Sequence, residues 1–260
     1  MTLLQLDDVA INVRQWGDGD PVIFVHGLGM SADLFFNQVQ PFAAKYRMVG
    51  VDVRGFGRSD KPQKEGAYLI ERLAEDIAGV IRGLGFERAH YVGTSMGGYI
   101  GISLAVIAPE LCRSLVLCHT GCRASIPKDV LQFRLDALKN QSMEEYVKLV
   151  SGQALAQPAD PIVTEWVEEN LARNNREVYT QILVEGLSYF DATERVASIR
   201  IPTLVIVGDQ DRVIPPEHGR EVAGLIDGAQ LVEIEGVGHL SYMERPEVFN
   251  QAILDFLAKF

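Results

Sequence analysis

A serine flanked by glycines is the feature of this sequence most suited to covalent chemistry. Residues 93–97 read Gly-Thr-Ser-Met-Gly and follow an apolar run at 89–92 that is typical of a buried strand. A small, apolar stretch typical of a helix comes next. A tight strand-to-helix turn strains its central residue and lifts the Ser95 hydroxyl above the sheet edge. Side chains at the flanking positions would clash, which explains Gly93 and Gly97. A chance glycine-rich turn is the alternative, and the strand and helix around it disfavour that reading.

A serine hydroxyl needs a base, and the sequence offers five histidines. They are His26, His90, His119, His218 and His239. His239 follows the last apolar run, at the carboxyl end of a strand, where parallel sheets place their sites. His90 lies at the wrong end of its strand, and His218 lies in a charged helical pattern. We predict His239 as the base and His119, which ends a strand, as a pocket residue, with a packing role as its alternative.

The base needs an orienting carboxylate, and residues 208–211 supply two aspartates. This Gly-Asp-Gln-Asp segment also follows an apolar run, so it lies at a carboxyl end between Ser95 and His239 in the chain. The order Ser95, Asp211, His239 is the order expected when a turn of this kind carries the nucleophile. Asp209 competes with Asp211 for the role of the acid.

Two backbone amides could stabilise the negative oxygen that forms during attack on a carbonyl. Residues 26–29 read His-Gly-Leu-Gly and follow the apolar run at 22–25, so the N–H of Leu28 is one candidate. The N–H of Met96 at the start of the helix is the other. We expect His26 to support this loop by hydrogen bonding.

Short apolar runs that alternate with amphipathic segments predict a parallel sheet covered by helices on both faces. The predicted strands are 22–25, 48–53, 89–92, 114–118, 202–207 and 230–234, and the predicted core helices are 69–84, 96–107, 216–226 and 246–260. Residues 3–16 alternate polar and apolar side chains and predict an antiparallel hairpin at a sheet edge, with its turn at Asp7 and Asp8.

A stretch of about 80 residues without a clear strand interrupts this rhythm. Its helical patterns cover 128–140, 143–150, 162–174 and 176–189. We predict a helical cap at 121–199, inserted into a core formed by 1–120 and 200–260.

These motifs resemble the α/β-hydrolase fold superfamily over essentially the whole chain. The matching segments are 26–29, 52–60, 93–98, 208–211 and 238–239. The resemblance implies an α/β fold, namely a mostly parallel eight-stranded sheet flanked by helices, with an inserted helical cap. It favours Asp211, because the family places its acid three residues after the glycine that ends the strand. It assigns a structural role to the loop 52–60.

The resemblance also narrows the reaction. Serine at position 95 disfavours the haloalkane dehalogenase-like and epoxide hydrolase-like members, which use aspartate there. The run at 28–31 is similar to serine esterases and lactonases of the 3-oxoadipate enol-lactonase-like and haloperoxidase-like kind. We expect an acyl-enzyme hydrolase of a small-to-medium carboxylic ester or lactone, without a metal or organic cofactor. One alternative is a carbon–carbon bond hydrolase of ring-cleavage products, although Met30-Ser31 and Thr94 depart from its usual pattern. Another is a small-molecule receptor or sensor with slow hydrolysis.

Substrate choice depends on the pocket walls, for which the sequence offers only single candidates. They are Phe35, His119, Arg123, Phe133 and Trp166. Arg123 could anchor a substrate carboxylate, with a solvated arginine as its alternative, and ordinary core packing is the alternative for the aromatic side chains.

Composition excludes several classes of function. The 260 residues are 47% hydrophobic, and 24 basic against 35 acidic side chains give a net charge of -11. This charge disfavours nucleic acid and anionic lipid as partners. Every apolar run is too short to span a membrane, and the first residues do not resemble a secretory signal. Cys112, Cys118 and Cys122 lack metal-binding spacing and suggest free thiols, so we expect a cytoplasmic protein.

Overall fold

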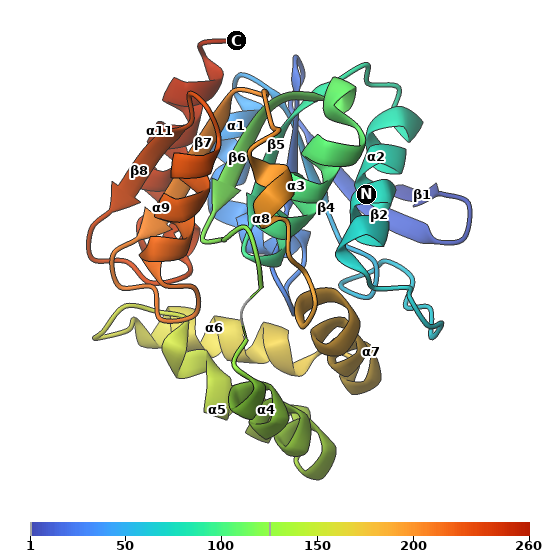
Figure 1. Cartoon of the computed structure of the whole chain (residues 1–260), viewed down its shortest axis with the longest axis vertical. Coiled ribbons are helices and arrows are strands. Elements are labelled where there is room, and N and C mark those ends of the chain that lie inside the picture. Colours follow the sequence, from blue (N-terminus) through green and yellow to red (C-terminus); the bar gives the residue numbers. More distant parts are fainter. Residues whose placement is uncertain (1, 125) are drawn as a thin grey trace.

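The computed structural model describes residues 2–124 and 126–260. Its strands form one sheet in the order β1-β2-β4-β3-β5-β6-β7-β8 (Figure 1). They are β1 (Thr2–Gln5), β2 (Ala10–Trp16), β3 (Pro21–Val25), β4 (Arg47–Val51), β5 (Ala89–Thr94), β6 (Cys112–Cys118), β7 (Thr203–Gly208) and β8 (Gln230–Ile234). β1 and β2 pair antiparallel, β2 pairs antiparallel with β4, and the remaining pairs are parallel. The predicted mostly parallel eight-stranded sheet and its edge hairpin are confirmed.

Helices cover both faces of this sheet. They are α1 (Phe36–Ala43), α2 (Ile70–Gly83), α3 (Met96–Ile107), α4 (Lys128–Asn140), α5 (Met143–Val150), α6 (Pro161–Ala172), α7 (Arg176–Gln181), α8 (Thr193–Val196), α9 (Pro216–Leu225), α10 (Ser241–Glu244) and α11 (Pro246–Leu257). In Figure 1, α3 and α9 lie in front of the sheet and α1 lies behind it. The sequence pattern located α2, α3, α9 and α11 but missed α1, which spans only two turns and contains a proline.

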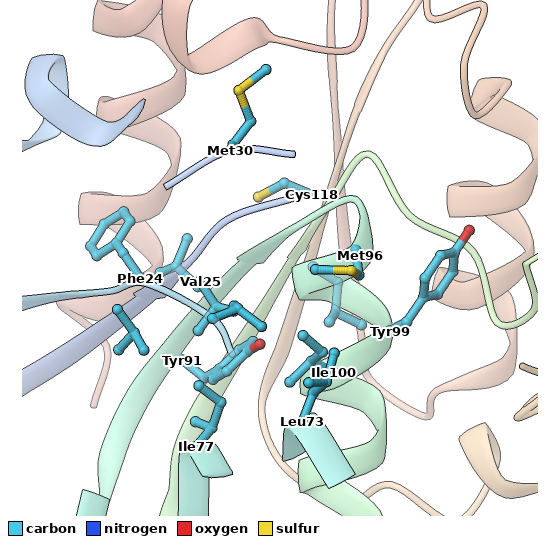
Figure 2. Packing of buried hydrophobic residues seen from close by; sticks show 14 of the residues in the cluster. Phe24, Val25, Met30, Leu73, Ile77, Tyr91, Met96, Tyr99, Ile100 and Cys118 are labelled. Atoms are coloured by element: carbon cyan, nitrogen blue, oxygen red, sulfur yellow. The ribbon is translucent and has the colours of Figure 1, made fainter. Parts of the chain in front are cut away.

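The core beneath the site joins α2 and α3 to the central strands. Figure 2 shows Leu73 and Ile77 of α2 packed near Ile100 of α3 and Tyr91 of β5. The α2 residues recur at helical spacing, as an amphipathic helix on a sheet requires. α3 is buried on nearly all sides, so its small residues allow close packing. This packing gives the start of α3 a firm position at the sheet edge.

Helices α4 to α7 lie together beyond one end of the strands (Figure 1). α4 and α5 have the predicted bounds, and α6 begins at Pro161, where Asp160 accepts a hydrogen bond from the N–H of Ile162 at 2.8 Å. The last predicted helix is split into α7 and a π-helical segment, Ile182–Leu187. The short helix α8 packs back against α3. Among the helices of the described chain, none has the length and apolar character needed to cross a bilayer.

Candidate active site

Ser95 lies in the turn between β5 and α3 with a strained backbone. Its φ of 56° and ψ of -118° place it where side chains are rarely tolerated. Two hydrogen bonds hold this conformation: the N–H of Ser95 donates to the carbonyl of Cys118 at 2.8 Å, and the carbonyl of Ser95 accepts from the N–H of Gly98 at 2.8 Å. The strain is therefore supported from both β6 and α3.

The two glycines of the turn are required by close backbone contacts. A Cβ atom at Gly93 would lie 2.2 Å from the carbonyl oxygen of Gly97, and one at Gly97 would lie 2.3 Å from the carbonyl oxygen of Val25. The Tyr91 hydroxyl donates to the Gly97 carbonyl at 2.5 Å and ties the turn to β5. A larger residue at either position would displace the helix that carries Ser95.

Ser95 opens into a cavity of about 190 Å³. Loops at the carboxyl ends of the strands form one side of it, and residues of helices α4 to α7 and their connections form the other. Most of the walls are apolar, as Leu28, Val150, Leu171 and Leu187 illustrate. Such a cavity can exclude water from a reacting carbonyl group.

His239 lies on the same cavity wall and is bound to Asp211. The Nδ1 of His239 is 2.8 Å from Oδ2 of Asp211. A carboxylate only accepts hydrogen bonds, so Nδ1 carries the proton and Nε2 is the free basic nitrogen. The other oxygen, Oδ1, accepts from the N–H groups of Val213 and Ile214, both at 2.9 Å. Ser95 and His239 line the same cavity, so Nε2 is the ring nitrogen that remains for the Ser95 hydroxyl.

The environment of Asp211 favours its ionised form. Burial alone would raise the pKa of this carboxyl. The charge of His239 and the hydrogen bonds from His119 and His239 outweigh burial and hold the pKa below its usual range. The competing residue, Asp209, is exposed and accepts from the N–H of Gly236 at 2.7 Å. The structure thus brings Asp211, and not Asp209, to the histidine.

His119 corrects the sequence prediction, because it lies behind Asp211 and does not line the cavity. Its Nδ1 is 3.2 Å from Oδ2 of Asp211, and its Nε2 is 2.6 Å from the hydroxyl of Ser241. Only 1% of His119 is exposed, and burial lowers its pKa, so the ring is neutral. Both ring nitrogens of His119 are used, whereas His239 lines the same cavity as Ser95.

Of the two amides predicted for oxyanion binding, one belongs to Met96, which follows Ser95 in the chain, and the other to Leu28, which lines the same cavity. Leu28 lines the cavity, and its N–H has no hydrogen-bond acceptor in the ranges that the structure describes. Met96 is the first residue of α3, where a helical N–H has no acceptor four residues earlier. His26 supports the Leu28 loop as predicted: Val53 N–H donates to its Nε2 at 2.9 Å, and its Nδ1 is 2.7 Å from the carbonyl of Gly27.

Comparison with known proteins agrees with this architecture. A family model described as the alpha/beta hydrolase fold matches residues 20–246. The chain belongs to the α/β-hydrolase family. RutD of Azorhizobium caulinodans, which is named as a carbamate hydrolase, is 30% identical over 252 residues. The alignment covers 92% of this chain and 92% of RutD.

Two further relatives of this α/β-hydrolase carry names for other substrates. A 2-hydroxy-6-oxo-6-phenylhexa-2,4-dienoate hydrolase of Comamonas testosteroni is 29% identical over 268 residues, covering 97% of this chain and 92% of that protein. The enol-lactonase structure from Burkholderia xenovorans LB400 superposes with a TM-score of 0.89 at 28% identity, covering 96% of this chain and 97% of that one. Relatives within this family are thus named for the cleavage of different bonds.

The structure also corrects most of the other predicted pocket residues of this α/β-hydrolase. Phe35 is 1% exposed and packs in the core, Phe133 is 56% exposed to solvent, and Trp166 packs outside the cavity walls. Arg123 does line the cavity, but its guanidinium forms two hydrogen bonds to Glu221 at 2.9 and 3.1 Å. Its charge is compensated by this partner.

A segment of the cap holds the loop of His239 in this hydrolase, and the sequence carried no signal for it. The N–H of His239 donates to the carbonyl of Ala154 at 2.8 Å. The Glu244 carboxylate accepts from the N–H groups of Gly238 at 2.9 Å and Ala156 at 2.7 Å. Burial raises the pKa of Glu244, although these amides partly oppose that shift. Glu244 thus bridges the cap and the histidine loop.

Three buried groups of the site also have the composition of a metal-binding cluster. Ligand atoms of His119, Asp211 and His239 lie within 4.8 Å of one another. The hydrogen bonds described above already account for their closeness, because Asp211 Oδ2 accepts from both rings. The arrangement fits an acid that orients a histidine base.

Proposed function

We propose that this chain is a serine hydrolase that cleaves a carboxylic ester or lactone through an acyl-enzyme. One observation carries the proposal: Ser95 and His239 line the same cavity, while Nδ1 of His239 is held by Asp211. This leaves Nε2 of His239 as the base for the Ser95 hydroxyl. A strained serine, an oriented histidine and an ionised aspartate are the parts of a nucleophilic triad.

The reaction would follow from these positions. Nε2 of His239 takes the Ser95 proton as Oγ bonds to the carbonyl carbon, and the N–H groups of Leu28 and Met96 stabilise the oxyanion. The intermediate collapses and expels the alcohol, which receives the proton from His239. Water, deprotonated by His239, then attacks the acyl-enzyme, releases the acid and restores Ser95. Asp211 keeps the histidine in the correct tautomer and stabilises its protonated form.

The ester or lactone is favoured by the cavity and by one relative. The walls are mostly apolar around a small volume, which suits a small-to-medium uncharged reacting group. A relative named as an enol-lactonase shares the whole fold at 28% identity. The relative named as a dienoate hydrolase keeps carbon–carbon bond cleavage as the second candidate. The expected cytoplasmic location stays a prediction.

A labelling and turnover experiment tests the proposal. A fluorophosphonate should modify the wild-type protein and fail to modify Ser95→Ala, and Ser95→Ala should lose about 10³-fold or more in turnover. The panel of substrates contains short-chain 4-nitrophenyl esters, lactones, carbamates and ring-cleavage dienoates. Brisk multiple turnover of esters or lactones supports the proposal, and preference for the dienoates supports carbon–carbon cleavage. Labelling followed by a single slow turnover would indicate a receptor or sensor instead.

A further inference from the structure

The cavity has a charge balance opposite to that of the whole chain. Two arginines, Arg123 and Arg134, contribute to its walls together with two histidines. No Asp or Glu is among the described residues that line it. This contrasts with an overall net charge of -11. A cationic cavity in an acidic protein attracts anions locally, while the remaining surface repels them.

The two arginines differ in what neutralises them. Arg123 is held by both carboxylate oxygens of Glu221, so its charge is compensated within the protein. Arg134 lies on α4, is half-buried, and forms neither an ion pair nor a hydrogen bond with any residue in 2–124 or 126–260. Removing a guanidinium from part of its water without an anionic partner is unfavourable. A ligand that supplies the anion would reverse this cost.

The charge of Arg134 acts on another wall residue of the cavity. Burial raises the pKa of the neighbouring wall residue Tyr179, and the positive charge of Arg134 opposes part of that rise. Ser95 lies on the side of the cavity formed by the sheet, whereas Arg134 of α4 lies on the side formed by helices α4 to α7. A substrate that contacts both would span the cavity with its reacting carbonyl at one end and an anionic group at the other.

We propose that Arg134 binds a carboxylate of the substrate, so the preferred substrates are esters or lactones that carry a carboxylate away from the reacting carbonyl. The inference rests on the proposed function and extends it to a substrate class. A guanidinium presents two parallel N–H groups that match the two oxygens of a carboxylate. Arg134 is then the residue that determines specificity, in place of Arg123, which the sequence suggested.

A matched pair of esters tests the preference. Mono-4-nitrophenyl glutarate and 4-nitrophenyl valerate have acyl chains of equal length, but only the glutarate carries a terminal carboxylate. The wild type should favour the glutarate in kcat/KM, and Arg134→Met should reduce the glutarate-to-valerate ratio by about 10- to 100-fold. Arg134→Lys should retain part of the preference. The control Arg173→Met removes an exposed cap arginine that pairs with Glu169, and it should keep the wild-type ratio.

A binding measurement separates this inference from the proposed reaction. Monomethyl glutarate is titrated by calorimetry into Ser95→Ala, with and without Arg134→Met, after thermal unfolding has confirmed that each variant is folded. The Kd should rise about tenfold or more when Arg134 is replaced. An unchanged Kd and an unchanged ester ratio would overturn the carboxylate site while leaving the hydrolase intact. Arg134-dependent binding without ester turnover would support the carboxylate site and overturn the proposed function.

Discussion

Glu244 offers the sharpest test of how the cap supports the histidine loop. The variant Glu244→Ala removes the acceptor for two N–H groups, those of Gly238 and Ala156, which lie 2.9 and 2.7 Å from the carboxylate. These donors belong to segments more than 80 residues apart in the chain, so the variant removes one of the links between the cap and the loop of His239. The hydrogen bond from the N–H of His239 to the carbonyl of Ala154 remains.

The expected loss can be worked from these two bonds. Leaving a buried donor without an acceptor costs about 1–3 kcal/mol. Two features reduce the expected loss of stability. Glu244 is only partly buried, so water can replace part of the lost hydrogen bonding. Burial also raises the pKa of the carboxyl, which shows that its charge is partly desolvated in the folded protein. We therefore expect Glu244→Ala to lower the free energy of unfolding by about 2–4 kcal/mol. Glu244→Gln keeps one acceptor oxygen and should lose about half as much.

Urea unfolding at neutral pH measures the stability, and ester turnover measures the position of His239. Because the N–H of His239 is bound to Ala154 in the same cap segment, kcat should fall in Glu244→Ala more than KM rises. The control is Glu235→Gln, since Glu235 is exposed and forms no hydrogen bond with the part of the chain that the structure describes. A Glu244→Ala protein with the wild-type unfolding free energy and kcat would show that Glu244 does not hold the histidine loop in place.

Three further predictions concern the turn, the acid and a buried histidine. Asp211→Asn places an amide against two imidazole N–H groups, disturbs the tautomer of His239 and should lower kcat by about 10⁴-fold, with little loss of substrate binding. Gly97→Ala should abolish ester turnover and lower the midpoint of thermal unfolding, because the new Cβ would lie 2.3 Å from the carbonyl oxygen of Val25. Burial lowers the pKa of His90 from 6.5 to about 4. Between these two pH values the unfolded chain binds a proton at His90, whereas the folded protein does not. Stability should therefore decline as the pH falls from about 6.5 to 4, by about 2–3 kcal/mol, and His90→Gln should flatten that decline in urea titrations. Equal pH slopes would contradict this assignment.

The elements of the fold were largely predictable because their signals are local. β7 is buried at every position and contains the apolar run 204–207, and β5, which is also fully buried, ends its apolar part at the serine turn. α2 buries one stripe at helical spacing, and α4 and α5 begin and end where their patterns do. The serine turn is also local, since the residues that force it are its own neighbours. The short helix α1 escaped prediction because two turns contain too few positions to show a period.

The choice between His119 and His239 illustrates what needed the folded chain. Both follow a strand, both contact Asp211, and the sequence assigned them by position alone. Only the structure shows that Ser241 occupies the second nitrogen of His119 and that His239 faces the cavity. Burial and the number of hydrogen-bond partners depend on segments that meet after folding.

The sheet, the serine turn and the order of serine, acid and histidine could be predicted from the residues alone, because backbone sterics and hydrophobic periodicity act between near neighbours. The substrate side of the cavity depends on how the chain folds. Phe133 and Arg134 are adjacent in α4, yet the helix turns one to solvent and the other to the cavity. The bonds of Glu244 and the compensation of Arg123 by Glu221 likewise join residues far apart in the chain. These interactions stabilise the protein only after folding has brought the paired groups together and removed part of their water.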